Sequence, residues 1–423
     1  MKEGQAKRAE LLSWLYVAVA VAVIFATIFY ARILRDYVAQ WFDSDIYIVV
    51  TFIGVGTIVV LSICYLIRSG RRSLESYIWL AIAFAIFGGY VIAQIDVPIE
   101  ALHFLEYGLL GILLYRALSH RVRDRSVFIS VAVLGAAVGT LDEFTQWVVP
   151  GRFWGLHDIW IDFFAVLLTQ LGIAKGVNPA RTAAAPTAHG LQWLCRSSLI
   201  AVVLLGVSAM NTPNVIAWYA DRYEALAFLK QNTSTMFEFG YFHEDPSIGQ
   251  FKSRLTLDEL RQTDLRRGRA AAAIVDQYAH RDRYPDFLKT YSPMVDPFVH
   301  EAGVRLAHRD NHLRVLTDFF DEMEESNRPR HANIGYRENQ ILETYFPETL
   351  KHSKRIAAPA KLALARANMT TDDVYLSRVS KRLVTSMSKT TFAVAFILLA
   401  GVLVWLERYF AARHRKGLAQ QND

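Results

Sequence analysis

Eight long apolar runs constrain the fold of this chain more than any other feature of its sequence. Each run approaches the ~20 residues that a helix needs to cross the hydrocarbon core of a bilayer. The runs occupy residues 11–31, 46–67, 77–95, 102–118, 127–149, 159–173, 194–210 and 391–406. Because lipid offers the backbone no hydrogen bonds, spanning segments of this length must be helical. The sequence therefore predicts an all-α, polytopic membrane protein of about eight transmembrane helices, with a mostly helical extramembrane domain between the seventh and the eighth.

Basic residues alternate regularly between the segments that connect these runs. They precede the first run and follow the second, fourth, sixth and eighth runs: Lys2, Lys7, Arg8, Arg68, Arg71, Arg72, Arg116, Arg121, Arg123, Arg125, Lys175, Arg181, Arg408, Arg413, Arg415 and Lys416. Loops rich in Lys and Arg stay in the cytoplasm, so we expect a multi-pass membrane protein with both termini cytoplasmic. The same alternation explains the net charge of +6 without a nucleic-acid partner.

The apolar runs divide the chain into six segments. Residues 1–76 hold the first two transmembrane helices, 77–176 a four-helix membrane core, 177–193 a cytoplasmic linker rich in Pro, Ala and Thr, and 194–210 the seventh helix. Residues 211–389 are expected to form a periplasmic domain, and 390–423 the last helix with a basic cytoplasmic tail. We expect the periplasmic domain to be helical, because a capping box at Thr256 and Glu259 opens an apolar pattern of helical period, whereas alternating β-branched residues are scarce.

Polar and ionisable residues interrupt the fourth, fifth and sixth runs near their outer ends. They are His103, Glu106 and Tyr107 on the fourth run, Asp142, Glu143 and Gln146 on the fifth, Arg152 in the turn that follows, and Asp158 and Asp162 on the sixth. Spacings of three and four residues place most members of each set on one helix face. Ionisable groups at membrane depth are costly and mark functional sites. We therefore expect these side chains to converge on one outward-opening pocket.

The five carboxylates of this cluster outnumber its cationic groups, which favours a functional site over a structural one. Like charges at short range leave proton donors and acceptors together, so Asp142, Glu143 and His103 are candidate acid–base residues. Arg152 is suited to contact a phosphate. The other members would complete a substrate-binding set: Glu106, Tyr107, Gln146, Asp158 and Asp162. The alternative is a structural network, in which Arg152 neutralises carboxylates and His103 bonds to Glu106.

Two segments of the chain resemble a known family. The stretch HFLEYGLLGILLYRAL, followed by GTLDEFTQWVVPGRFWGLHDIWIDFFAVLLTQLG, is similar to the VanZ-like family of bacterial membrane proteins, over about residues 77–176. The shared pattern is a His-Phe and a Tyr on one helix, then Asp-Glu-x-x-Gln, Pro-Gly-Arg and an Asp that opens the last helix. Asp162 departs from it, since family members usually carry Asn there. The resemblance implies a cell-envelope role, connected with low-level teicoplanin resistance (an antibiotic-resistance phenotype) or with exopolysaccharide.

Three functions are compatible with these features. In the first, the polar site binds or modifies a membrane lipid or a lipid-linked glycan precursor of peptidoglycan or exopolysaccharide. This function admits either binding alone or catalysis. In the second, the protein is a non-catalytic scaffold whose periplasmic domain docks a protein partner in envelope assembly. In the third, the carboxylates relay ions in a coupled transporter, although no matching polar sites continue toward the cytoplasm.

The periplasmic segment contains one weak metal-binding candidate. His308 and His312 are four residues apart, and Glu301 lies seven residues before His308 on the same helical stripe. Two imidazoles and a carboxylate can hold a metal ion. However, Arg309 stands where a zinc-protease helix carries Glu, so surface histidines are the simpler interpretation. We therefore expect neither a metal nor another cofactor.

Overall fold

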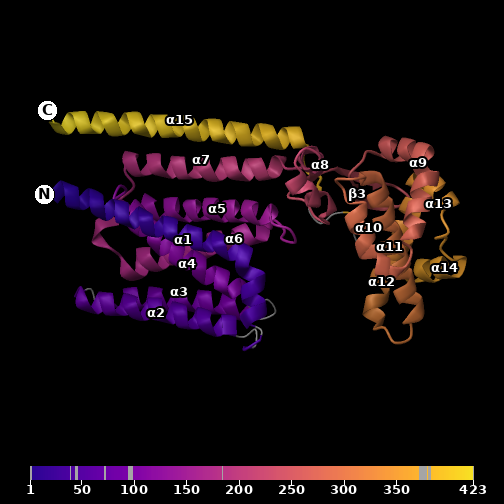
Figure 1. Ribbon diagram of the computed structural model, residues 1–423, viewed down its shortest axis with the longest axis horizontal. Coiled ribbons are helices and arrows are strands. Elements are labelled where there is room, and N and C mark those ends of the chain that lie inside the picture. Colours follow the sequence, from indigo (N-terminus) through magenta and orange to yellow (C-terminus); the bar gives the residue numbers. More distant parts are fainter. Residues whose placement is uncertain are drawn as a thin grey trace. The chain divides into compact units, whose positions relative to one another are not determined.

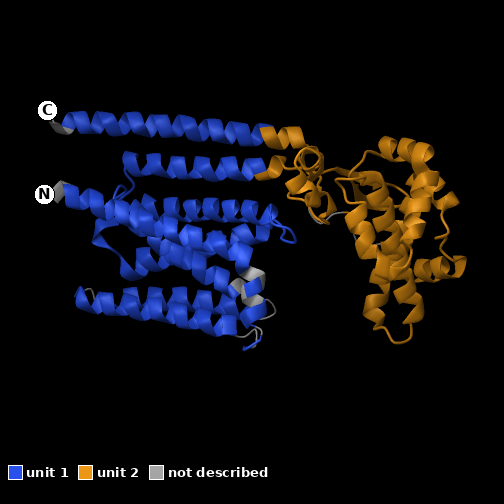
Figure 2. Cartoon of the chain, in the orientation of Figure 1, with its two compact units in different colours: residues 1–207, 394–423 blue, residues 208–393 orange. Residues whose placement is uncertain are grey.

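The computed structural model describes residues 2–38, 40–42, 46–70, 73–93, 99–182, 184–370, 379 and 383–422. Helices account for most of these residues and strands for few of them. Within the described residues, eight helices are long and apolar enough to cross a membrane. The all-α, polytopic membrane fold expected from the hydropathy pattern is therefore confirmed. The chain forms two compact units, residues 1–207 with 394–423, and residues 208–393 (Figure 2).

Long helices build the membrane-spanning unit (Figure 1). They are α1 (Lys2–Val38), α2 (Ile46–Arg68), α3 (Leu74–Ala93), α4 (Ile99–Leu118), α5 (Ser126–Trp147), α6 (Leu156–Leu171), α7 (Ala188–Met210) and α15 (Lys389–Asn422). A π-helical turn, η1 (Gly172–Val177), continues α6, and a 3-10 turn, η2 (Ala180–Thr182), precedes α7. α1 and α15 extend past the apolar runs that predicted them, because good helix formers such as Ala, Lys, Arg and Gln flank those runs.

Small residues let α5 approach α6 closely. A Cβ added at Gly135 would lie 2.6 Å from Val166 Cγ2, and one added at Gly139 would lie 2.5 Å from Asp162 Oδ2. On the other side of α6, a Cβ at Gly111 of α4 would lie 3.2 Å from Val166 Cγ1. Glycines spaced by four residues are a common means of close helix packing in membranes, where the hydrophobic effect does not drive association. This packing holds α4, α5 and α6 together as the core of the unit.

The segment between α6 and α7 is fixed by one buried carboxylate. Asp124 Oδ1 accepts a hydrogen bond from the amide of Ser126 at 2.9 Å, and Oδ2 accepts one from the amide of Thr187 at 3.0 Å. The hydroxyl of Thr187 also donates to Oδ2 at 2.5 Å. The start of α5 and the start of α7 are thus tied together, although 63 residues separate Asp124 from Thr187.

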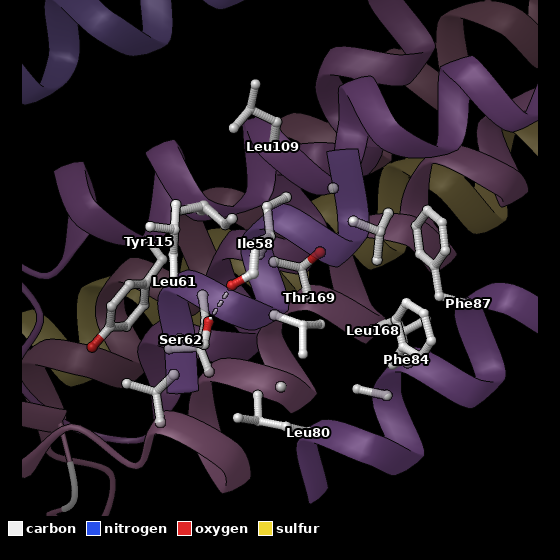
Figure 3. A pocket seen from close by; sticks show the side chains of 18 of the residues that line it. Ile58, Leu61, Ser62, Leu80, Phe84, Phe87, Leu109, Tyr115, Leu168 and Thr169 are labelled. Carbon is white, nitrogen blue, oxygen red and sulfur yellow. Dashed lines mark hydrogen bonds between the residues drawn. The ribbon is translucent and has the colours of Figure 1, made fainter. Parts of the chain in front are cut away.

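An apolar cavity of about 580 Å³ lies between α2, α3, α4 and α6 (Figure 3). Its walls are mainly aliphatic and aromatic side chains, such as Leu80, Phe87 and Leu168. The hydroxyl of Ser62 lies in this lining and donates to the carbonyl of Ile58 at 2.8 Å, so it is satisfied within its own helix (Figure 3). The cavity is apolar, and the only ionisable side chains among its described lining residues are Tyr65 and Tyr115.

The second unit, residues 208–393, is a separate helical body with its own core. Its helices are α8 (Pro213–Ala220), α9 (Leu257–Gln277), α10 (Tyr284–Thr290), α11 (Pro297–Asp318), α12 (Arg328–Tyr345), α13 (Pro347–His352) and α14 (Pro359–Asn368), with the 3-10 turns η3 (Glu224–Gln231), η4 (Arg281–Arg283) and η5 (Glu325–Asn327). The capping box predicted at the start of α9 is present, since the side chain of Thr256 accepts from the amide of Glu259 at 3.2 Å.

Sheet structure in this unit is small, as expected. The strands β2 (Tyr241–Asp245) and β3 (Gly249–Ser253) form an antiparallel hairpin. The two-residue strands β1 (Glu238–Phe239) and β4 (Leu383–Val384) pair in parallel. The core beside the hairpin includes ionic groups, because the fully buried Arg305 on α11 contacts Glu301 at 2.7 Å and Glu338 of α12 at 3.0 Å.

Candidate functional site

A polar cavity of about 310 Å³ lies between α4, α5 and α6 in the membrane-spanning unit. It is lined by His103, Asp142, Glu143, Gln146, Gly151, Arg152, Phe153, Asp158, Ile161 and Asp162. These residues come from the start of α4, the end of α5, the turn that follows and the start of α6. The cavity therefore lies at one end of three packed helices, which we call the site end. It brings together all the residues that the sequence singled out in this region except Glu106 and Tyr107.

Glu106 and Tyr107 lie beside the cavity and support its wall. Glu106 Oε2 is 3.5 Å from Nδ1 of His103, three residues earlier on the same helix. This is one of the contacts that the structural interpretation anticipated. Tyr107 is fully buried among the side chains of the core. Neither residue lines the cavity. Glu106 contacts His103, which does line it, and the buried hydroxyl of Tyr107 lies near Asp142 and Asp162.

The turn after α5 brings Arg152 to the cavity. The amide of Val149 donates to the carbonyl of Gln146 at 3.0 Å, which closes the last turn of the helix. Pro150 cannot continue the helical ladder because it lacks an amide hydrogen. Gly151 has a φ of 76°, a left-handed conformation that glycine adopts without strain. The chain then reverses, and the amide of Arg152 donates to the carbonyl of Val149 at 3.1 Å.

A chain of hydrogen bonds joins the guanidinium to the carboxylates through one amide. Arg152 donates from Nη2 to Oε1 of Gln146 at 2.7 Å. Gln146 donates from Nε2 to Glu143 Oε1 at 2.7 Å and to Asp142 Oδ2 at 3.3 Å. Glu143 Oε2 accepts from the backbone amide of Gly155. Within the described residues, Arg152 thus reaches the carboxylates through Gln146 and forms no direct ion pair with them.

The two carboxylates at the end of α5 differ in whether all their oxygens already accept hydrogen bonds. Glu143 is fully buried, and each of its oxygens already accepts a hydrogen bond. Asp142 is 2% exposed, and its Oδ1 has no hydrogen-bond partner within the described part of the chain. The same holds for Nε of Arg152. A buried polar atom without a partner costs about 1–3 kcal/mol. A ligand that forms hydrogen bonds to these two atoms would therefore gain binding free energy.

The carboxylates of α6 are held tightly against the turn and against α5. A Cβ at Gly155 would lie 2.3 Å from Asp158 Oδ2, and a Cβ at Gly139 would lie 2.5 Å from Asp162 Oδ2. Only glycine leaves room for these side chains without movement of a neighbour. Four carboxylates therefore share a cavity with one arginine and one histidine. In such a site protons can move among acids held at short range, and cationic groups are attracted.

The second unit does not assemble the candidate metal ligands. Glu301 binds Arg305 at 2.7 Å instead of facing the histidines. His312 Nδ1 lies 3.0 Å from His331 Nδ1, and the rings of His308 and His312 are 6.3 Å apart. No group of three His, Cys, Asp or Glu side chains among the described residues is arranged to hold a metal ion. Glu301, His308 and His312 are therefore not brought together among the described residues, because the buried ionic network takes the carboxylate away from the imidazoles.

Comparison with protein-family models, with characterised proteins and with solved structures gives no match. The similarity to the VanZ-like family accordingly stays a prediction from the motifs quoted above.

Sequence reasoning missed several residues on which the site depends. Gly155 supplies the backbone amide that binds Glu143, and Gly139 makes room for Asp162. The four-residue spacing of Gly135 and Gly139 is a recognisable signal for close helix contact in a membrane. The role of Gly155 has no comparable signal, because it depends on the path of the turn.

Proposed function

We propose that this protein binds the polar headgroup of a lipid-linked cell-envelope intermediate in the cavity between α4, α5 and α6. The observation that carries the proposal is the combination of a buried arginine donor and buried carboxylates, contributed by consecutive membrane-spanning helices, around one cavity at the site end. Polar residues in membrane helices are expensive and face functional cavities by default. A lipid headgroup is the polar ligand that every membrane offers at helix-end depth.

The size of the cavity supports a headgroup as the ligand. Its volume of about 310 Å³ lies at the lower end of the range for small-molecule sites, which is about 300–1,000 Å³. A phosphate with one attached polar group fits this range, whereas a complete lipid does not. The hydrocarbon chains of such a ligand would stay in the surrounding bilayer.

The proposed roles follow from the hydrogen bonds. Arg152, with an unpartnered Nε, would bind an anionic oxygen of the headgroup by a charge-assisted hydrogen bond. Asp142, with an unpartnered Oδ1, would accept a hydrogen bond or a proton from the ligand. His103 lines the same cavity beside Glu106 and is the second candidate for proton transfer. If the ligand is chemically modified, we assign the acid–base step to Asp142 and His103.

The proposed location is the outer half of the bacterial inner membrane. The Lys- and Arg-rich segments lie at the opposite end of the helices from the cavity, and positively charged loops remain cytoplasmic. The second unit, inserted between α7 and α15, would then be periplasmic. Labelling of whole cells with a membrane-impermeant maleimide tests this orientation. Asp282→Cys, in a residue that is 85% exposed, should be labelled and Arg123→Cys should not, with the two native cysteines measured as background. The reverse pattern would contradict an outward-facing cavity.

Lipid binding is tested with full-length protein purified in a non-ionic detergent and analysed by native mass spectrometry. A bound anionic or zwitterionic lipid should be retained by the native protein and lost from Arg152→Gln. Arg123→Gln is the matched control, because Arg123 is an exposed arginine on the chain segment before α5 and lines no part of the cavity. Equal retention of lipid by the native protein and Arg152→Gln would refute the site and favour a scaffold, whose partner would bind elsewhere.

A further inference from the structure

We infer that the headgroup bound in the polar cavity is zwitterionic, with a protonated amine that faces the carboxylates and an anionic oxygen that faces Arg152. This inference rests on the proposed function and narrows it to one class of ligand. It follows from three features of the cavity, namely its charge balance, its two unpartnered polar atoms and the side chain that joins them.

The charge balance of the cavity disfavours a purely anionic ligand. Four carboxylates line it, Asp142, Glu143, Asp158 and Asp162, against the guanidinium of Arg152 and the imidazole of His103. A phosphate alone would add negative charge to a site that already holds an excess of acidic groups in a medium of low dielectric. Repulsion between like charges grows steeply as the dielectric constant falls. A ligand that also carries a cation would complement Asp142 as well as Arg152.

The unpartnered atoms have opposite character. Arg152 Nε is a donor without an acceptor, and Asp142 Oδ1 is an acceptor without a donor, within the described residues. Asp142 is 2% exposed and lines the cavity. An ammonium group supplies the donors that Asp142 lacks, and a phosphate or carboxylate oxygen supplies the acceptor that Arg152 lacks. A single zwitterionic headgroup meets both needs.

The side-chain amide of Gln146 connects the two residues that carry these atoms. Gln146 accepts from Arg152 Nη2 at 2.7 Å through its oxygen and donates to Asp142 Oδ2 at 3.3 Å through its nitrogen. The residues that carry the free donor and the free acceptor are therefore joined through one side-chain amide. A headgroup with a phosphate and an amine on a short linker, as in phosphoethanolamine, would offer one charge to each of these residues.

Two other acidic residues of the cavity, Glu143 and Asp162, limit where the amine can bind. Glu143 is already committed to Gln146 and to the amide of Gly155, so it contributes negative potential rather than a free acceptor. Asp162 lies against Gly139 of α5 and lines the same cavity as Asp142. The amine would then sit between α5 and α6, with Asp142 as its direct acceptor, while the anionic oxygen points to the turn after α5.

The test uses full-length protein in a maltoside detergent, titrated with short-chain lipids and monitored by native mass spectrometry. Dioctanoyl phosphatidylethanolamine is compared with its N-acetylated derivative and with dioctanoyl phosphatidic acid, which keep the phosphate but lack the charged amine. We expect the first lipid to bind about tenfold or more tightly than the other two, which is the effect of one charged hydrogen bond. Asp142→Asn should remove this preference, Arg152→Gln should weaken all three lipids, and Glu75→Gln, an exposed acid at the start of α3, should change nothing.

The outcomes separate this inference from the proposed function. If the three lipids bind equally and the binding of each depends on Arg152, the headgroup site is supported and the recognition of a protonated amine is refuted. If no lipid binding depends on Arg152, the proposed function itself fails. The final measurement uses soluble phosphoethanolamine as a competitor of the lipid. If it competes as well as the lipid does at equal concentration, the zwitterionic chemistry is upheld and the lipid source is overturned.

Discussion

Glu143 and Asp142 are adjacent carboxylates that form different hydrogen bonds. Replacing each in turn by its amide therefore distinguishes a role in stability from a role in ligand binding. Glu143 joins the end of α5 to the turn before α6, because its two oxygens accept from Gln146 and from the amide of Gly155. Asp142 holds Gln146 weakly, at 3.3 Å, and keeps one oxygen unused. We therefore expect Glu143→Gln to destabilise the protein and Asp142→Asn to leave its stability unchanged or raised.

The size of the effect follows from the number of acceptors. A glutamine at position 143 offers one oxygen where the carboxylate of Glu143 offers two, so one of the two donors loses its partner and faces an amide nitrogen instead. A buried donor left without its acceptor costs about 1–3 kcal/mol, so the free energy of unfolding should fall by about 2 kcal/mol. Asn at position 142 still accepts from Gln146. It also removes one negative charge from a crowded set, which relieves repulsion.

The assay is denaturation of the purified protein in mixed detergent micelles with increasing dodecyl sulfate, followed by tryptophan fluorescence. Trp147 and Trp154, two of the nine tryptophans of the chain, are buried on either side of the turn, so the signal includes a contribution from this region. Equal stability of Glu143→Gln and the native protein would refute the assignment of Glu143 as an acceptor of two hydrogen bonds that stabilise the fold. A loss of more than about 1 kcal/mol in Asp142→Asn, the size of an ordinary hydrogen bond, would show that Asp142 is structural instead.

Three further predictions concern packing and buried charge. Gly139→Ala should cost about 1–3 kcal/mol of stability in the same assay, because the new methyl group would meet Asp162, whereas Gly89→Ala, with open space around it, should be tolerated. Arg305→Met should destabilise residues 208–393 by about 3–5 kcal/mol, measured by circular dichroism during denaturation, because two buried glutamates lose their shared partner. Burial lowers the pKa of His300 to about 4 from 6.5. The free energy of unfolding of residues 208–393 should therefore be unaffected by this group above pH 6.5 and should fall by up to about 3 kcal/mol as the pH drops toward 4. His300→Gln should remove this part of the pH dependence.

The sequence was sufficient to predict the features that depend on local pattern. The membrane spans follow from the length of the apolar runs, and the end of α5 follows from Pro150 and Gly151, which stop a helix by known backbone geometry. The meeting of three polar helix ends was predictable as well. A short turn joins α5 to α6, and charged groups at membrane depth must face each other or water.

Features that depend on contacts between distant segments could not be predicted in this way. The spacing of Glu301 and His308 is compatible with one helical stripe, but Glu301 is bound by Arg305, which Glu338 of another helix also contacts. Similarly, nothing in the sequence around Asp124 indicates that it binds Thr187. In both cases the partner is chosen by tertiary packing, and local spacing carries no information about it.

The close contact between α5 and α6 explains how a membrane-spanning unit can retain so many carboxylates. Gly135 and Gly139 let the two helices approach until Val166 and Asp162 fill the space that side chains would otherwise occupy. Asp162 is therefore 3% exposed and faces protein rather than lipid. A bundle selected for stability alone would replace such groups with apolar residues of similar volume, an exchange that is often neutral or stabilising. That the chain instead shields them with glycines, and leaves one oxygen of Asp142 without a partner among the described residues, favours a role in binding over a role in folding.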